Sequence, residues 1–331
     1  MIKAHNITAL EVDGRRYIPL DIDVTPFDNT GSHRENVGRT YKGCDGFAPI
    51  FAYVGTQGWL LHHELRPGVQ HCQKGTPDFL RETLARFDAL GCKERALVRL
   101  DAGNDSADTV AILRESEHGF ILKRNQRQED PIKWLSHATA QSSEPERPRP
   151  GKEVYIGTCD HMSPGGESSE QAPLPIIYQV IRRSIDKHGN ALLIDEIEVQ
   201  TYWTNLGETP ENIIALYHDH GTSEQFHSEL KSDLNLERFP SQNYATNGLY
   251  LQLGALAYNL LRALDERARG HRDKWPERIK NVMRRRVGSV IRDLIAVASK
   301  WVKHGGREVM KVARDWPWSG VMVAIDKELS V

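Results

Sequence analysis

Four side chains whose types suit chemistry on a phosphate backbone recur at helical spacing in residues 217–231, YHDHGTSEQFHSELK. They are Tyr217, His220, Glu224 and Lys231. The last three lie three, seven and fourteen residues after the first, so a continuous helix would carry all four on one face. One carboxylate flanked by a phenol, an imidazole and an ammonium group indicates a site that acts on phosphodiesters.

The spacing resembles the Y-(2)-R-(3)-E-(6)-K signature of bacterial insertion-sequence transposases of the DDE type, with His220 where that pattern usually has arginine. The text that follows, LKSDLNLERFPSQNYATNGLYLQLGALAYNLLRAL, also resembles the sequence after the catalytic glutamate in one branch of that family. The resemblance extends from about residue 17 to the end of the chain. It implies a ribonuclease-H-like fold in which Glu224 is the last carboxylate of a catalytic triad.

The first acid of such a triad must lie on a rigid, buried strand. In residues 17–24, YIPLDIDV, apolar and polar residues alternate with a period of two, which predicts a strand that carries Asp21 and Asp23 on one face. The family's first aspartate lies in a D-x-T pattern, and residues 23–25, DVT, match it. The resemblance therefore assigns Asp23, with Asp21 as its neighbour.

The second acid is expected after a short apolar strand, and residues 96–101, ALVRLD, provide one that ends at Asp101. Residues 101–106, DAGNDS, resemble the D-x-G-x-x-S turn of the family, where Gly103 permits a tight turn into a helix. Asp105 is the less favoured alternative. An isolated aspartate near a strand is more often a turn or cap residue. The occurrence of all three acids together, in the expected order and on the expected elements, favours a triad.

Three carboxylates from separate elements form a plausible cage for two divalent ions, Mg²⁺ or Mn²⁺. These hard ions prefer carboxylate oxygen. Two of them about 3.5–4 Å apart can neutralise the charge between the attacking and leaving oxygens of a phosphodiester. The resemblance implies that Asp23, Asp101 and Glu224 hold them.

The remaining residues of the signature would bind DNA. Lys231 and His220 could bind phosphate oxygens, and Tyr217 could donate a hydrogen bond or stack on a base. The net charge of −2 does not itself indicate DNA binding, but residues 262–314 are rich in arginine and lysine interleaved with apolar residues. This pattern predicts amphipathic helices whose basic face lies along phosphates, with a solvated face as the alternative. The DNA contacts assigned to this region are the consecutive residues Arg284, Arg285 and Arg286.

The order of predicted elements agrees with a ribonuclease-H-like mixed sheet with flanking helices. Three strands, a helix, a strand, a helix and a strand follow one another. They are expected at residues 17–24, 49–54, 59–65, 77–90, 96–101, 105–115 and 119–123. Thr76 and Pro77 are expected to open the first helix, as its cap and its first residue.

A β-rich insertion is expected to interrupt this α/β domain. Strand patterns recur at residues 153–158, 176–184 and 191–200, after the polar, proline-rich residues 142–151. We therefore divide the chain into a first part of the catalytic domain, the insertion, a second part of the catalytic domain and a basic helical C-terminal region. The boundaries are 1–124, 125–200, 201–265 and 266–331.

Composition favours a soluble, cytoplasmic protein. Hydrophobic residues make up 39% and charged residues 27% of the 331, and no apolar run approaches the roughly 20 residues of a membrane helix. The four cysteines form no CxxC pair, so neither a zinc site nor a disulfide framework is indicated.

These features predict the catalytic core of a DNA transposase that hydrolyses phosphodiesters and transfers strands at the ends of a mobile element. A ribonuclease-H-like nuclease without strand transfer would use the same carboxylates, and an inactive, truncated transposase would only bind DNA. In the family, a further N-terminal region usually precedes the first catalytic strand, whereas sixteen residues precede Tyr17 here. Bringing two DNA ends together implies a homodimer in the active complex.

Overall fold

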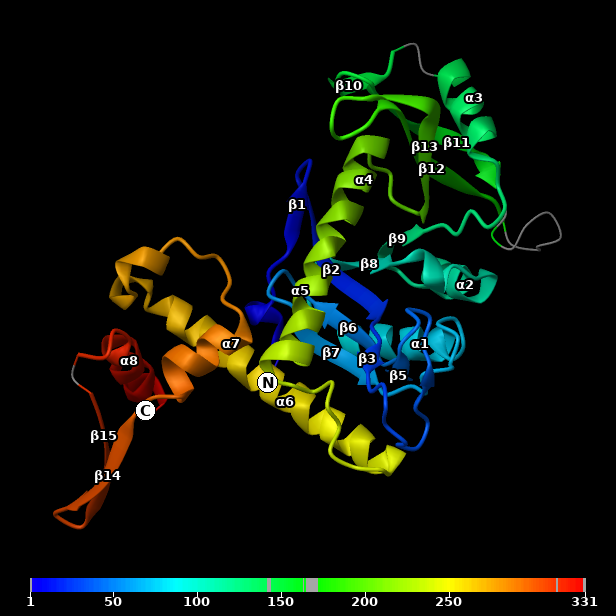
Figure 1. The fold of residues 1–331 in the computed structure, drawn as a ribbon. Helices are drawn as coiled ribbons and strands as arrows, with labels where there is room; N and C mark the ends of the chain where they lie inside the picture. Colours follow the sequence, from blue (N-terminus) through cyan, green and yellow to red (C-terminus); the bar gives the residue numbers. More distant parts are fainter. Residues whose placement is uncertain (1, 142–143, 163, 165–171, 314, 330–331) are drawn as a thin grey trace.

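The computed structural model describes residues 2–141, 144–162, 164, 172–313 and 315–329. Within them, a main sheet of ten strands runs through the molecule, with helices on both of its faces (Figure 1). The strand order is β10-β11-β12-β13-β9-β8-β2-β6-β7, and β1 pairs with β2. The bounds are β1 (Leu10–Val12), β2 (Arg15–Val24), β6 (Ile50–Val54), β7 (Trp59–Glu64), β8 (Arg95–Leu100), β9 (Gly119–Lys123), β10 (Glu146–Arg149), β11 (Lys152–Met162), β12 (Leu174–Ile185) and β13 (Ala191–Thr204).

Helices and two small sheets complete the described chain. The α-helices are α1 (Thr76–Asp88), α2 (Ala107–Glu115), α3 (Pro131–Gln141), α4 (Pro210–His218), α5 (Thr222–Ser228), α6 (Tyr244–Gly270), α7 (Val287–Val290) and α8 (Ser319–Leu329). Short 3-10 turns are η1 (Ala4–Asn6), η2 (Ala102–Asn104), η3 (Asp219–Gly221), η5 (Arg272–Lys274) and η6 (Glu277–Ile279), and π turns are η4 (Glu229–Asp233) and η7 (Ile291–Ile295). The small sheets are β3 (Phe27–Asp28) with β5 (Asp45–Phe47) and β4 (Gly38–Arg39), and β14 (Ser299–His304) with β15 (Arg307–Val312).

The central strands β7-β6-β2-β8-β9 have the order and directions of a ribonuclease-H-like sheet. Strands β7, β6 and β2 pair antiparallel, whereas β2, β8 and β9 pair parallel. The two parallel connections contain α1 and α2, as expected of crossover helices. The fold class predicted from the sequence is therefore confirmed. The predicted cap differs by one residue, because Gly75 is the N-cap of α1 and Thr76 is already helical.

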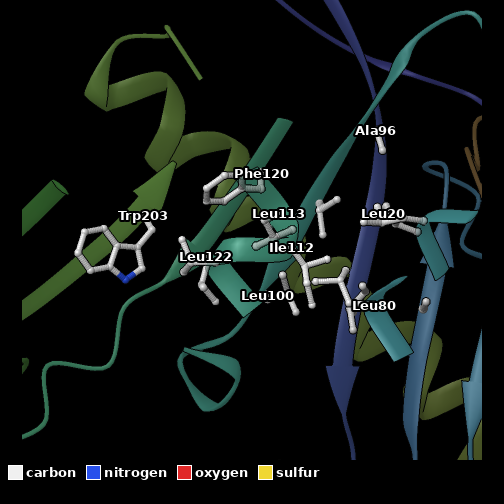
Figure 2. Packing of buried hydrophobic residues seen from close by; sticks show 14 of the residues in the cluster. Leu20, Leu80, Ala96, Leu100, Ile112, Leu113, Phe120, Leu122 and Trp203 are labelled. Carbon is white, nitrogen blue, oxygen red and sulfur yellow. The ribbon is translucent and has the colours of Figure 1, made fainter. Parts of the chain in front are cut away.

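One face of the sheet packs against α1 and α2. Figure 2 shows Leu20, Leu100 and Leu122, from three neighbouring strands, gathered with Leu80 of α1 and Leu113 of α2. All five are buried, and the even-numbered residues of β2 and β8 point to this side because side chains alternate along a strand. This face forms an apolar core. The odd-numbered residues of β2 and β8 lie on the other face.

The opposite face is covered by α4, α5 and α6. Tyr53 of β6 packs against Phe226 of α5, with ring centroids 5.1 Å apart, and both are buried with Tyr258 of α6. The β6–β7 turn must stay narrow here, because Gly58 has a φ of 69° and a Cβ on it would lie 2.4 Å from the Phe226 ring. The helices that follow the β insertion are thereby fixed against the central strands.

The inserted strands continue the main sheet and do not form a sheet of their own. The predicted strand positions fall on β11, β12 and β13, and Tyr202 to Thr204 of β13 pair antiparallel with β9. The helix α3 covers them, with Trp134 and Ala138 buried, and the sequence analysis did not expect it. The insertion and the catalytic sheet thus share one hydrogen-bonded layer (Figure 1).

The basic C-terminal region differs from its prediction. It contains helices, but residues 299–312 form the β14–β15 hairpin and not a further amphipathic helix. Gly305 and Gly306 connect the strands with φ values of 59° and 77°, which suits a two-residue hairpin turn. The helix α6 also runs past residue 265, where a domain boundary was predicted, and ends at Gly270. Within the described residues, no helix has the length and apolar character needed to cross a bilayer.

Two adjacent histidines of β7 make stability depend on pH. Burial, followed by the charge of Arg86, lowers the pKa of His62 and of His63 to about 4 each. The unfolded chain takes up these protons near pH 6.5, so acid favours unfolding as the pH falls from about 6.5 to about 4. We expect each histidine to remove up to about 1.4 kcal/mol per pH unit from the free energy of unfolding in this window.

The check is urea unfolding at several pH values, with the parent chain compared with a His62→Gln, His63→Gln variant. The variant should lose less stability between pH 6.5 and 4 than the parent. Equal losses would show that these two side chains do not carry the effect.

Candidate active site

Asp23 and Asp101 lie at the carboxyl ends of two adjacent parallel strands. The register of β2 with β8 pairs Asp21 with Arg99 and Ile22 with Leu100, so Asp23 and Asp101 come next in line. Neighbouring strands lie about 4.8 Å apart. Both acids have odd residue numbers, so their side chains lie on the face of the sheet that α4, α5 and α6 cover. The sheet thus brings the two carboxylates predicted from the sequence together.

The loop after β8 holds Asp101 by close contacts. The Asn104 side chain donates a hydrogen bond to Asp101 Oδ1 at 2.6 Å. A Cβ on Gly103 would lie 3.2 Å from the same oxygen and 3.1 Å from Cys72 Sγ. A larger residue at this position would press on the carboxylate and on Cys72, so glycine lets the loop pass close to Asp101.

The two alternative acids are engaged elsewhere. Asp21 is buried and forms a two-pronged ion pair with Arg99, with Nε–Oδ1 and Nη2–Oδ2 distances of 2.6 and 2.9 Å. Asp105 accepts hydrogen bonds from the indole of Trp203 at 3.0 Å and from the backbone of Asn125 at 2.9 Å. These contacts give both acids a structural role: Asp21 neutralises a buried arginine, and Asp105 connects Trp203 to the backbone at Asn125.

Arg99 also connects the sheet to the helices above it. Its Nη1 donates to the carbonyl of Leu216 at 2.7 Å and to Asp219 Oδ2 at 3.1 Å. Leu216 is near the end of α4, and Asp219 opens η3. The segment that carries the sequence signature is therefore anchored beside the acids.

His227 is the site residue that the sequence analysis missed. It is buried in α5, with Nε2 3.2 Å from Asp23 Oδ2 and Nδ1 3.2 Å from the hydroxyl of Tyr53. Burial raises the pKa of Tyr53 well above its usual value, so this phenol stays protonated. The signal in the sequence was the spacing: His227 is three residues after Glu224 and so lies close to the predicted helical stripe, although in the structure His227 is buried and Glu224 is exposed.

Tyr217 and Tyr41 lie beside the same strand ends. Tyr217 is buried against Tyr202, with ring centroids 4.8 Å apart. Burial, and then the negative charge of Asp101, raises the pKa of Tyr217, which keeps its phenol a hydrogen-bond donor. Tyr41, a second residue that the sequence analysis missed, donates to the Val24 carbonyl at 3.0 Å, one residue beyond Asp23.

Lys231 is half-buried on the same side of the sheet. Its ammonium lies 5.7 Å from the centre of the Phe27 ring. Burial lowers the pKa of Lys231, and the charges of Glu237 and Asp23 act in the opposite direction.

The signature segment is not one continuous helix, and this corrects the predicted stripe. The helix α4 ends at His218, η3 breaks it, and α5 passes into the π turn η4 before Lys231. His220 lies in η3, and its side chain is outside the described part of the structure. Glu224 is in the first turn of α5 and is exposed to solvent.

The carboxylate oxygens of the site are suitable ligands for a hard divalent ion, but the predicted set of three carboxylates is incomplete. Asp23 and Asp101 offer carboxylate oxygens from adjacent strand ends, the ligand type that Mg²⁺ and Mn²⁺ prefer. Among the residues that the structure describes, no three His, Cys, Asp or Glu side chains converge closely enough to bind an ion. Glu224 would have to move closer to the two aspartates to complete it.

The three consecutive arginines have different surroundings. Arg284 binds the fully buried Glu229, with Nη2 2.9 Å from Oε2. Arg285 pairs with Asp265 at 2.7 Å, and its guanidinium lies between two tryptophan rings with a side chain only 3% exposed. Arg286 pairs with Asp233 at 3.0 Å and is 39% exposed. Of the three predicted DNA contacts, only Arg286 has the exposure that such a contact requires.

One comparison with known proteins identifies a family. A family model described as transposase DDE domain group 1 matches residues 12–330. No curated protein matches the sequence. Among solved structures, the chain is similar to piggyBac transposase in a synaptic complex with hairpin DNA, with a TM-score of 0.42 and 10% identity over 74% of this chain. The match covers 46% of that chain, so this protein spans less than half of its length.

Matched substitutions can compare the contributions of Asp21 and Asp23 to stability. Asp21→Asn removes the negative charge that neutralises the buried Arg99. We expect a loss of about 3 kcal/mol in the free energy of unfolding. Asp23→Asn alters a partly exposed carboxylate, and a loss below about 1 kcal/mol is expected. Chemical denaturation of both variants measures the difference. Similar losses would mean that Asp21 and Asp23 are equally structural.

Proposed function

The chain belongs to the transposase DDE domain family, and on this premise we propose that it is a DNA transposase catalytic core. It would hydrolyse phosphodiesters at the ends of a mobile element and then transfer the strands. The observation that carries the proposal is the adjacent placement of Asp23 and Asp101 at parallel strand ends, beneath the segment that bears Tyr217, His227 and Lys231. An acidic pair with protonated donors and an ammonium beside it suits a phosphodiester better than a neutral substrate.

Asp23, Asp101 and Glu224 would hold the divalent ions, two Mg²⁺ or Mn²⁺. When bound, such ions lower the pKa of an attacking water or 3′-hydroxyl and neutralise the charge that develops on the phosphate. The oxygen donors agree with these ions in type.

The other residues prepare the site without changing covalently. His227, held by Tyr53, fixes the direction of the Asp23 carboxylate. Tyr217 stays protonated near both acids and can donate a hydrogen bond to a phosphate oxygen. Lys231 supplies a positive charge whose partial burial strengthens its attraction to phosphate.

Glu224 would reach the aspartates by a small rewinding of its own segment. The 3-10 turn η3 precedes α5 and the π turn η4 follows it, and departures from α geometry of this kind often occur at functional hinges. Divalent cations held by the two aspartates would favour the closer position, because their positive charge attracts the Glu224 carboxylate. The proposal also includes duplex DNA as the partner, a homodimer as the active complex and the cytoplasm as the location.

The central prediction concerns the three carboxylates. Asp101→Asn and Glu224→Gln should each lower nicking of labelled duplex carrying the mobile element's ends, in Mg²⁺ or Mn²⁺, by at least about 10³-fold. Exposed acids of the same type provide the controls Asp108→Asn and Glu211→Gln, which should cut like the parent. Undiminished cleavage by Asp101→Asn or Glu224→Gln would remove that residue from the mechanism.

Two assays separate the proposal from its alternatives. A duplex with a pre-cleaved 3′-hydroxyl end tests joining directly, and a nuclease that never joins strands would cut DNA but give no joined product. An inactive remnant would bind DNA in a salt-sensitive way, with neither cleavage nor a metal requirement.

A further inference from the structure

The β14–β15 hairpin is an exposed ribbon with no strand partner beyond itself. In the described chain its two strands pair only with each other, and every residue except Val302 is exposed. Trp301 and Met310 are 68% and 48% exposed. In Figure 1 the ribbon projects from the body near the C-terminus, far from the carboxyl ends of β2 and β8. An isolated two-stranded hairpin is only marginally stable in water, so a partner surface would stabilise it.

The register of the ribbon gathers positive charge on one face. Lys300 lies opposite Lys311, and His304 lies opposite Arg307. Residues directly opposite each other in an antiparallel pair share a face, and alternate pairs share the same one. We call these four side chains the basic ribbon face. On this face Lys300 and Lys311 are directly opposed, and like charges in that position destabilise a ribbon that is alone in water. Arg307 adds a third positive charge to the same face.

The only acid of the ribbon is on the other face. Glu308 lies opposite Lys303, one register position away from the basic pair at the turn. Within the residues that the structure describes, no ion pair involves any member of the basic ribbon face. Their charge is thus balanced neither across the ribbon nor by the rest of the described chain.

We propose that the basic ribbon face binds the phosphate backbone of duplex DNA at a site separate from the candidate active site. A two-stranded ribbon fits the major groove of B-DNA, which is about 12 Å wide. The two basic pairs are four residues apart, or about 13 Å along the strands, so they can reach phosphates across such a groove. Phosphates would also relieve the repulsion between Lys300 and Lys311. This inference rests on the proposed function in taking DNA as the partner, and it adds a second contact surface.

Matched lysine substitutions on the two faces of β14 test it. Lys300→Gln removes a charge from the basic ribbon face, whereas Lys303→Gln removes the same charge from the other face, three residues away. The probe is a fluorescent duplex of arbitrary sequence, about 30 base pairs or three helical turns long. Its equilibrium binding to the full chain is measured at several salt concentrations. The slope of log affinity against log salt should become shallower by about 1 for Lys300→Gln and by about 3 for Lys300→Gln, Arg307→Gln, Lys311→Gln, and should not change for Lys303→Gln.

Each outcome has a distinct meaning. Equal slopes for Lys300→Gln and Lys303→Gln overturn the ribbon proposal, and so does an unchanged slope in the triple variant. A triple variant that binds DNA like the parent but sediments as a smaller species assigns the ribbon to contact with a second copy of the chain, which also overturns it. Cleavage by the parent is measured separately, so a ribbon that fails leaves the proposed catalysis standing, and a ribbon that binds without cleavage contradicts only the catalysis.

Discussion

The buried charge of Arg99 is the constraint on which the site depends. A guanidinium in the middle of a sheet must be neutralised, because burying an unpaired charge costs several kcal/mol. Asp21 supplies the neutralising carboxylate from β2, and Leu216 and Asp219 accept the remaining hydrogen bonds from the helical segment above. Satisfying this one side chain therefore fixes β2, β8 and the end of α4 relative to one another, directly before the positions of Asp23 and Asp101.

Much of the fold followed from local patterns in the sequence. Alternation predicted the central strands, and the turn at Gly103 located the end of β8. What the sequence did not reveal is which aspartate of β2 is paired, because alternation places Asp21 and Asp23 on the same face and the partner of Asp21 is 78 residues away in the chain. A one-dimensional pattern contains no information on such a contact.

The errors in the site have the same origin. The helical stripe assumed an unbroken α-helix from Tyr217 to Lys231, yet the structure has the 3-10 turn η3 and the π turn η4 in this segment. Side-chain spacing alone does not mark where an α-helix changes to such turns. His227 was missed because an imidazole on an apolar helix face is ordinarily a core residue. The basic run Arg284 to Arg286 was read as surface, although two of its members neutralise buried acids contributed by other helices.

The shared layer of insertion and catalytic sheet has a consequence for how the protein avoids aggregation. Strand β9 is parallel to β8 on one side and antiparallel to β13 on the other. Without β13, its outer row of N–H and C=O groups would become an open edge, the kind of surface on which strands of other molecules add. The end of β13, at Tyr202 to Thr204, thus covers the edge of an apolar β-strand, and its loss would leave that edge open to strands of other molecules.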